Sequence, residues 1–350
     1  MSRKGEAPLI LIRADASPSK GTGHVMRCLA LAEALREQEA VPVFATREIT
    51  PSLRERLLSD GFDHHDLMGD DPAALLELAD RLGATALVVD SYWLDAGWRA
   101  SVWPGFRAVL ALDDLADRML HADLVWNPAP GAASLPYAEL APGARLLAGE
   151  SYLLLRREIR QAATAPSLPL AGRIRILLTF GGSDPAGLTV PVVKRLAPTL
   201  PPGVWLDVVA GGSNPALDCI RAACARFPDR VRLHVDSREM GGLMAAAGLA
   251  VTAGGGTVAE LAALAVPSLL AVVADNQAPA AADARTRGWA AVVDARGDRA
   301  DAADAITARA LALWADLPAR HELSRRIAAG GIDGQGAARI ASALLERIRT

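Results

Sequence analysis

Residues 9–28 read LILIRADASPSKGTGHVMRC, and this stretch decides the fold of the first half of the chain. Leu9–Ile12 is a short apolar run with the length of a buried strand. A glycine-containing turn follows, and a helical pattern begins near His24. A strand, a glycine-rich turn and a helix form the opening of a parallel β-α-β unit. The stretch therefore predicts a doubly wound α/β domain.

The same alternation continues along the first half. Further buried strands are expected at Val41–Ala45, Ala86–Asp90, Ala108–Leu112 and Leu124–Trp126, and helices at Val25–Arg36, Ser52–Ser59 and Pro72–Leu82. The pattern breaks at Arg160–Gly172, which has little periodicity and holds two prolines, so we expect a linker over 161–172.

A second series of the same kind follows the break. Strands are expected at Ile174–Phe180, Trp205–Ala210, Val231–His234, Leu249–Thr252 and Ser268–Val272, and helices at Leu188–Leu196, Asn214–Ala225, Met240–Ala246, Val258–Ala265 and Gly336–Arg349. The sequence thus predicts two doubly wound Rossmann-like domains, 1–160 and 173–335, that face a cleft. The last helix, within 336–350, would pack at the surface or back on the first domain.

Composition narrows the class of protein. Of 350 residues, 51% are hydrophobic and 22% charged, which is enough apolar material for packed cores. The formal net charge of −3 argues against a nucleic-acid partner. Three cysteines without a framework spacing predict reduced thiols rather than a zinc site. With no signal peptide visible and Leu261–Ala274 too short for a membrane span, we expect a cytoplasmic monomer or weak oligomer.

The first glycine-rich loop is the leading candidate for chemistry. Gly21 and Gly23 allow a tight turn and a close approach to a ligand. The amides of a helix start favour an anion, and the same positive end would keep the imidazole of His24 neutral, as a general base requires. The alternative is that His24 only caps or packs the helix. The loop lacks the Walker A and dinucleotide fingerprints.

Polar residues also end the following strands. Asp90 could orient His24 or a substrate hydroxyl, and Tyr92 could hold a sugar. The D-D-x-x-D spacing from Asp113 resembles a magnesium cluster, but a capped helix start after a strand is the favoured interpretation. Asn127, after the next strand, is another polar group expected at the rim.

In the second half, two glycine-rich turns have the form of phosphate sites. Gly181–Asp184 lies between a strand and a helix, and Gly254–Thr257 places three glycines and a threonine before another helix. Glu260, one turn into that helix, could accept both ribose hydroxyls. Asp275–Gln277 ends the next strand and adds an amide pair.

The other histidines have weaker claims. His64, His65, His121, His234 and His321 are expected to be structural or exposed to solvent, the first two in a polar connection. The chain contains no D-x-D spacing and no G-x-S-x-G nucleophile elbow.

Taken together, these motifs resemble a known family. Arg13–Cys28, Val89–Tyr92, Leu112–Asp114, Phe180–Asp184, the glycines before Glu260, Asp275–Gln277 and the segment Gly149–Arg156 are similar to the pseudaminic-acid-pathway hydrolases that act on UDP-2,4-diacetamido-2,4,6-trideoxy-β-L-altropyranose. Those hydrolases are relatives of the MurG-type glycosyltransferases and have the GT-B fold. The glycines at 254–256 are closer to the MurG-type loop.

The resemblance implies attack of water at the anomeric carbon with inversion, release of UDP, and no metal or cofactor. It implies that His24 is the base, that Asp15, Tyr92 and Asn276 position sugar or water, and that Glu260 binds ribose. The further residues expected to bind substrate are Arg13, Gly21, Gly23, Asp90, Asn127, Gly181, Gly182, Ser183, Gly254, Gly255, Gly256, Thr257 and Gln277.

Three alternatives remain open from the sequence. A glycosyltransferase of the same fold would use a sugar or lipid acceptor, and a lipid acceptor would usually bring a basic amphipathic helix, which does not stand out here. A catalytically silent nucleotide-sugar sensor would bind without turnover. An NAD-dependent oxidoreductase would need the fingerprint glycines that are missing.

Overall fold

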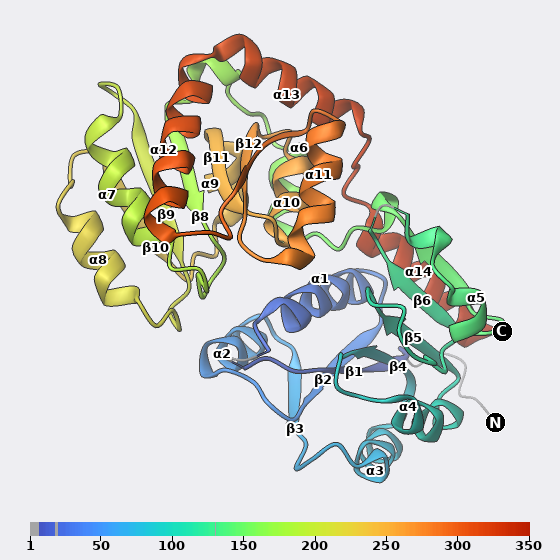
Figure 1. Cartoon of the computed structure of the whole chain (residues 1–350). Coiled ribbons are helices and arrows are strands. Elements are labelled where there is room, and N and C mark those ends of the chain that lie inside the picture. The colour runs from blue at the N-terminus through green and yellow to red at the C-terminus, as the bar shows by residue number, and fades with distance from the viewer. Residues whose placement is uncertain (1–6, 18–19, 130) are drawn as a thin grey trace. The chain divides into compact units, whose positions relative to one another are not determined.

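The protein folds into two compact units, each built on one parallel sheet (Figure 1). The computed structural model describes residues 7–17, 20–129 and 131–350. Unit 1 comprises residues 1–156 and 333–350, and unit 2 comprises residues 157–332. Two residues of the first glycine-rich loop, Pro18 and Ser19, lie outside the described residues. The predicted fold class, two doubly wound α/β domains, is confirmed.

The sheet of unit 1 has the strand order β3-β2-β1-β4-β5-β6-β7, and its strands pair in parallel. Its elements are β1 (Leu9–Ala14), α1 (Gly23–Glu37), β2 (Val41–Thr46), α2 (Pro51–Ser59), β3 (Asp63–Asp66), α3 (Pro72–Leu82), β4 (Ala84–Asp90), α4 (Ala96–Val102), β5 (Ala108–Leu112), β6 (Leu124–Asn127), α5 (Tyr137–Leu140), β7 (Arg145–Ala148) and α14 (Gly336–Arg349). The chain order reverses between β1 and β4, which is the switch point where ligands bind in such sheets.

Alternate residues of the central strands enter two cores, one on each face of this sheet. Ile10 and Ile12 of β1 belong to the core that α1 and α14 cover, whereas Leu11 belongs to the core under α3 and α4. All three side chains are fully buried. This burial on both faces explains why the strand is a continuous apolar run.

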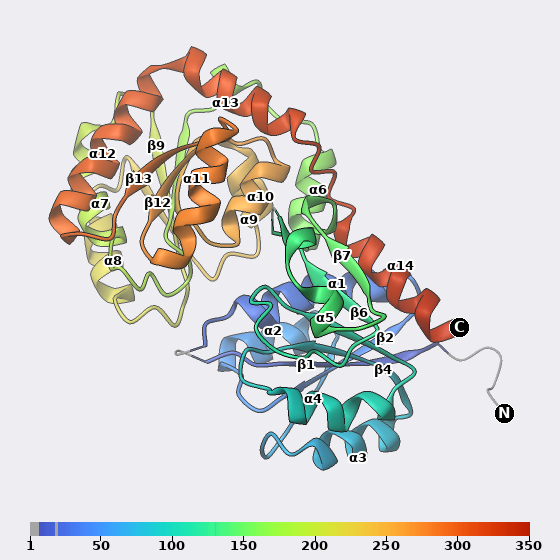
Figure 2. The ribbon, with the colours of Figure 1, turned by 45° about the vertical axis from the view of Figure 1, so that its right-hand side comes forward.

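The last helix, α14, is part of unit 1. Its residues Ile340 and Leu344 are fully buried in the same core as Leu31 and Leu35 of α1. At its start, a side chain on Gly336 would collide with the backbone of Leu153, so the close approach requires glycine. Figure 2 shows α14 running beside β7 and α1. The C-terminal segment therefore completes the core of the first unit.

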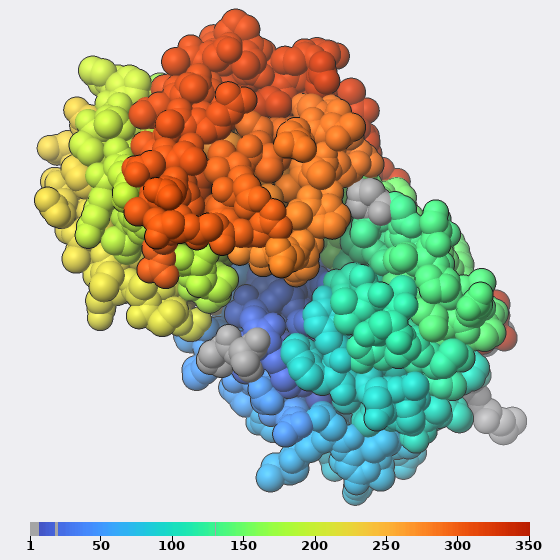
Figure 3. Space-filling model, viewed as in Figure 1, coloured from blue at the N-terminus to red at the C-terminus, as the bar shows by residue number. Residues whose placement is uncertain are grey.

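Unit 2 has the strand order β10-β9-β8-β11-β12-β13, again parallel. Its elements are α6 (Arg157–Thr164), β8 (Arg175–Thr179), α7 (Thr189–Thr199), β9 (Trp205–Ala210), α8 (Leu217–Ala225), β10 (Val231–Val235), α9 (Met240–Ala245), β11 (Ala247–Ala253), α10 (Thr257–Ala263), β12 (Ser268–Val272), α11 (Ala278–Thr286), β13 (Ala290–Asp294), α12 (Arg299–Ala315) and α13 (Leu317–Ala329). The switch point lies between β8 and β11. In the space-filling view, α11, α12 and α13 form much of the visible surface of this unit (Figure 3).

Several elements were not expected from the sequence. Strand β3 reads DHHD and has no apolar run, so the prediction of a polar connection at His64 and His65 was wrong. Pairing with β2 and a hydrogen bond between Thr46 and His64 Nε2 (2.8 Å) stabilise this edge strand. Strands β7 and β13 and the helices α11 to α13 were also missed.

The expected linker is shorter than its sequence suggested. Helix α6 occupies residues 157–164 and buries Ile159 completely. It packs so closely on α9 that a side chain on Gly241 would meet the backbone oxygen of Glu158. The first unit therefore ends at Arg156, and α6 belongs to the second unit, where it packs on α9 and α10.

No helix in the described part of the chain has both the length and the apolar character needed to cross a membrane.

Leu344→Ala should destabilise unit 1 by about 2–5 kcal/mol, because it opens a cavity in a close-packed core. Hydrogen exchange followed by mass spectrometry should show faster exchange in β1, β4 and β5 but not in β8 and β11. Arg349→Ala, an exposed change on the same helix, is the control. Unchanged exchange in unit 1 would contradict the assignment of α14 to its core.

Candidate active site

The candidate site of unit 1 lies where β1 and β4 end side by side. Ala14 at the end of β1 is paired with Asp90 at the end of β4. The loop after β1 leads into α1, whose second residue is His24. The switch point therefore brings His24 and Asp90 together, although 66 residues separate them.

Asp90 is the centre of a compact charged network. Its side chain is fully buried, and its Oδ1 lies 2.6 Å from His24 Nδ1. Arg27, one turn along α1 from His24, donates from Nε to Oδ2 (2.5 Å) and from Nη2 to Oδ1 (2.6 Å). The spacing of three residues puts His24 and Arg27 on one face of the helix.

This network fixes the tautomer of His24 when the ring is neutral. Burial alone would raise the pKa of Asp90, but the charge and hydrogen bonds of Arg27 and the bond from His24 lower it, so the carboxylate stays ionised. An ionised carboxylate only accepts hydrogen bonds, so Nδ1 of His24 carries the proton and donates it. No described residue bonds Nε2, and 7% of the side chain remains exposed. Nε2 is therefore the ring nitrogen that could meet a water molecule.

Tyr92 and Asp114 extend the network to the next two loops. The Tyr92 ring lies edge-on to His24, with centroids 4.6 Å apart. Its hydroxyl donates to Asp114 Oδ2 (2.8 Å), which also accepts from Arg27 Nη1 (3.0 Å). Burial and the bond to Asp114 raise the pKa of Tyr92, so the phenol stays protonated. Arg27 and Asp114 were not among the predicted site residues.

The carboxylate of Asp113 bonds different groups from that of Asp114. Its carboxylate accepts from the amide of Ala116 (2.8 Å) and from the hydroxyl of Tyr137 (2.8 Å). It therefore caps a turn rather than a helix start, since residues 113–123 contain no helix. Within the described residues, no group of three or more His, Cys, Asp or Glu side chains could hold a metal ion.

Arg13 and Asp15 form a buried support under the glycine-rich loop. Arg13 is 1% exposed and donates to both carboxylate oxygens of Asp15, at 2.6 and 3.0 Å. Asp15 also accepts from Lys20 Nζ and from the amides of Arg47 and Glu48. Both side chains are occupied inside the protein, so direct contact with substrate, predicted for both, does not fit their positions. They hold the loop in place instead.

Asn127 was predicted to lie at the rim of the site and to bind substrate, but it does not reach the surface. Its side chain is fully buried, donating to the Tyr137 hydroxyl (2.9 Å) and accepting from the amide of Ala129 (2.9 Å). Both ends of the amide are therefore satisfied, and Asn127 supports the end of β6 instead of reaching substrate.

In unit 2, the loop after β8 exposes Gly181, Gly182 and Ser183 at the switch point. Gly181 has φ +83°, a conformation that favours glycine. The next residue, Asp184, is buried and accepts from the amides of Leu188 and Thr189. Its carboxylate thereby occupies the start of α7, so an anion here would have to use the amides of the exposed turn.

The second glycine loop follows β11, the neighbouring strand. Gln277 Oε1 accepts from the amides of Gly254 (3.3 Å) and Val273 (3.1 Å), which ties this loop to the end of β12. The Oε1 atom of Gln277 therefore supports this loop, and Asn276 beside it is exposed. Gly256 precedes α10 and Thr257 is its first residue, and their amides are donors that no described residue uses.

Glu260 lies in the first turn of α10 and is half-buried. This is the same end of the helix as the glycine loop, so its carboxylate and the loop amides lie at the same edge of the sheet.

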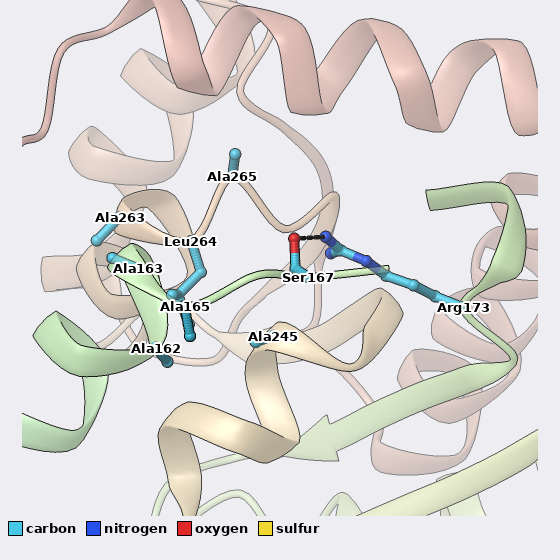
Figure 4. A pocket seen from close by; sticks show the side chains of 9 residues that line it. All are labelled: Ala162, Ala163, Ala165, Ser167, Arg173, Ala245, Ala263, Leu264 and Ala265. Atoms are coloured by element: carbon cyan, nitrogen blue, oxygen red, sulfur yellow. Dashed lines mark hydrogen bonds between the residues drawn. The ribbon is translucent and has the colours of Figure 1, made fainter. Parts of the chain in front are cut away.

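A small pocket in unit 2 lies at the opposite edge of the sheet. It has a volume of about 170 Å³ and is lined by Ala162, Ala163, Ala165, Ser167, Arg173, Ala245, Ala263, Leu264 and Ala265 (Figure 4). These residues precede β8, β11 and β12, so the pocket lies at the amino ends of the strands. Arg173 donates there to Ser167 Oγ and to backbone oxygens. The pocket is therefore separate from the switch-point loops.

Two parallel units of this strand order define the class: the chain has the GT-B fold of glycosyltransferases and related sugar-nucleotide proteins. MurG of Acinetobacter baumannii superposes with a TM-score of 0.60 at 14% identity, over 97% of this chain and 99% of that one. UGT2 of Phytolacca americana gives a TM-score of 0.67 at 11% identity, over 98% and 100%.

Relatives that share sequence similarity with the chain include named sugar-nucleotide enzymes. The chain is 25% identical to the UDP-2,4-diacetamido-2,4,6-trideoxy-beta-L-altropyranose hydrolase of Campylobacter jejuni, over 67% of this chain and 81% of that one. It is also 25% identical to the spore coat polysaccharide biosynthesis protein SpsG of Bacillus subtilis, over 76% and 78%. A third relative, 30% identical over 61% of this chain and 54% of its own, is the UDP-N-acetylglucosamine--N-acetylmuramyl-(pentapeptide) pyrophosphoryl-undecaprenol N-acetylglucosamine transferase of Sorangium cellulosum. No family model matches. The predicted resemblance to the hydrolases and to MurG-type proteins is confirmed.

Asp15→Asn should lower stability at neutral pH, and by about half as much at pH 3. Burial would raise the pKa of Asp15, yet the hydrogen bond and charge of Arg13 and two backbone amides lower it to about 2. A carboxyl with a depressed pKa adds stability above its unfolded value near 3.8, and this is lost as the pH falls toward 2.

The expected loss at pH 7 is on the order of 1–2 kcal/mol after allowance for solvent screening. Urea unfolding of both proteins at pH 7 and at pH 3 measures it. An equal difference at both pH values would contradict the assigned charge of Asp15.

Proposed function

We propose that this chain is a nucleotide-sugar hydrolase that releases UDP from a 2,4-diacetamido-2,4,6-trideoxy hexose, in pseudaminic acid biosynthesis. Water attacks the anomeric carbon, the configuration inverts, and no metal takes part. The broader assignment, a UDP-sugar-processing enzyme of the GT-B class, draws on relatives of both the hydrolase and the transferase kind.

One observation carries the proposal: a neutral His24 would have Nδ1 bonded to an ionised Asp90 and Nε2 unbonded by any described residue. That arrangement suits a general base, because the carboxylate orients the ring and stabilises the imidazolium that forms. The position of the pair also supports this function, because His24 follows a glycine-rich loop at the switch point between β1 and β4, where parallel sheets bind ligands.

The proposed reaction moves one proton and exchanges one bond at the anomeric carbon. His24 Nε2 accepts a proton from water while the water oxygen bonds to C1 of the sugar. The bond between C1 and the β-phosphate oxygen breaks, and its electron pair leaves with UDP. Asp90 stays ionised and holds the imidazolium, since Arg27 satisfies both of its oxygens. Tyr92 remains a protonated donor near the ring.

Unit 2 is proposed to bind UDP. The exposed turn Gly181–Ser183 and the amides of Gly256 and Thr257 would bind the diphosphate, and Glu260 would accept the ribose hydroxyls. Neutral amides stabilise the charge that develops on the leaving phosphate without needing to be deprotonated or coordinated.

A MurG-type glycosyltransferase is the second candidate. The relative from Sorangium cellulosum and the run of three glycines at Gly254–Gly256 favour it. In that reaction His24 would take its proton from an acceptor hydroxyl instead of from water, so the same base serves both chemistries.

Incubation of the protein with UDP-2,4-diacetamido-2,4,6-trideoxy hexoses, without an acceptor and with EDTA present, should release UDP and the free sugar in equal amounts. Proton NMR at the start of the reaction should show the inverted anomer. Tight binding of the sugar nucleotide with no release over long incubation would reject the hydrolase and leave the transferase or a sensor.

His24→Ala should lower kcat by about 10²–10⁴-fold, which is the usual contribution of general-base catalysis. Calorimetry should show unchanged affinity for UDP, because UDP is proposed to bind unit 2. His321→Ala, an exposed histidine on α13, is the matched control and should keep full activity. Near-normal turnover of His24→Ala would show that another group is the base.

A further inference from the structure

A large aromatic side chain beside His24 has no function in the mechanism above. Trp93, in the loop after β4, is 50% exposed. Its ring centroid lies 5.8 Å from that of His24 and 5.8 Å from that of Tyr92. An exposed indole at the carboxyl end of a strand, next to the candidate base, is in a position to contact a ligand.

The loop that carries Trp93 is firmly held. Ser91 Oγ accepts from the amides of Trp93 (3.1 Å) and Leu94 (3.3 Å). From below, Arg99 donates to the carbonyls of Ser91 (3.0 Å) and Leu94 (3.2 Å), and Arg118 donates to the carbonyl of Tyr92. Arg99 is 2% exposed, and burial lowers its pKa to about 10. A buried arginine thus supports a rigid loop that presents an aromatic ring to solvent.

The Trp93 indole has a hydrogen-bond donor that no described residue uses. The ammonium of Lys20 lies 4.9 Å from the ring centroid, while its hydrogen bonds go to Asp15 and Glu48. No described residue accepts a hydrogen bond from Trp93 Nε1. The side chain therefore offers an apolar surface and one free donor together, which is typical of aromatic residues at ligand sites.

We propose that Trp93 is the platform on which the sugar ring of the substrate rests, and that it selects sugars with N-acyl and deoxy groups. This inference rests on the proposed function for its ligand. The C–H groups of a pyranose pack on the indole, and a methyl at C6 avoids the desolvation that a hydroxymethyl would cost there. The indole N–H donates to the carbonyl oxygen of an acetamido group.

The test compares equilibrium affinities for UDP and for UDP-sugars by calorimetry, in a His24→Gln background that prevents turnover. Trp93→Ala should weaken binding of UDP-2,4-diacetamido-2,4,6-trideoxy hexose about tenfold, the scale of one aromatic contact. Its effect on UDP-N-acetylglucosamine should be smaller, and UDP alone should bind as before. Trp93→Phe should restore part of the affinity, because it keeps an apolar ring but has no donor.

The control is Trp103→Ala. Trp103 is exposed to 38% in the same unit but lies before β5, at the other edge of the sheet, and should leave every affinity unchanged. Equal weakening of UDP and UDP-sugar by Trp93→Ala would overturn the platform, as would no weakening at all. A native protein that binds UDP-sugars no tighter than UDP would overturn it too.

Different results would contradict the hydrolase proposal and the Trp93 platform. If the protein binds the trideoxy sugar through Trp93 but never releases UDP, the hydrolase is wrong and the platform stands. If UDP is released and Trp93→Ala leaves KM unchanged for every sugar, the platform is wrong and the hydrolase stands.

Discussion

The buried carboxylate of Asp90 is the group on which the candidate site depends. It lies at the end of β4 with no solvent exposure of its side chain, and a charge in such a place is stable only with well-aligned partners. Arg27 and His24, from one face of α1, supply them. Arg27 also donates to Asp114, which accepts from Tyr92, so Asp90 and Asp114 together join α1 to the loops after β4 and β5. Since β1 and β4 are adjacent only because the chain order reverses between them, the site is a direct consequence of the sheet topology.

The two units supply different kinds of group. Unit 1 provides charged and aromatic side chains on supported loops: the Arg13–Asp15 pair lies beneath the glycine-rich turn, and Arg99 lies beneath the turn of Trp93. Unit 2 provides exposed glycine turns, in which Asp184 and Gln277 bond part of the backbone and leave the rest available. Reactive groups need fixed positions, which explains why buried ionic contacts are placed under the loops of unit 1.

Much of the fold could be predicted from the sequence, because its central strands are apolar runs between helical patterns. Strand β3 could not, since its four polar residues depend on pairing with β2. At the site, the strand ends predicted Asp90 and Tyr92 near His24, where the structure places them. The sequence did not show that the side chains of Asn127 and Asp15 face the interior and bond other protein groups there. Arg27 could have been found, because its spacing of three from His24 places both on one helix face.

A second trio of the same residue types shows that position decides function here. In unit 2, the fully enclosed carboxylate of Asp207 accepts from His234 Nε2 (2.9 Å) and from Arg175 (2.9 Å). These residues sit within β9, β10 and β8, and their bonds connect three neighbouring strands. The chemistry of the two trios is nearly identical, and burial of the aspartate is the same. The first trio lies at the switch point between β1 and β4, where parallel sheets bind ligands, and its His24 ring is 5.8 Å from the exposed indole of Trp93. His234 belongs to β10, the edge strand of its sheet. The topology, rather than the combination of histidine, aspartate and arginine, therefore separates a candidate catalytic group from a structural one.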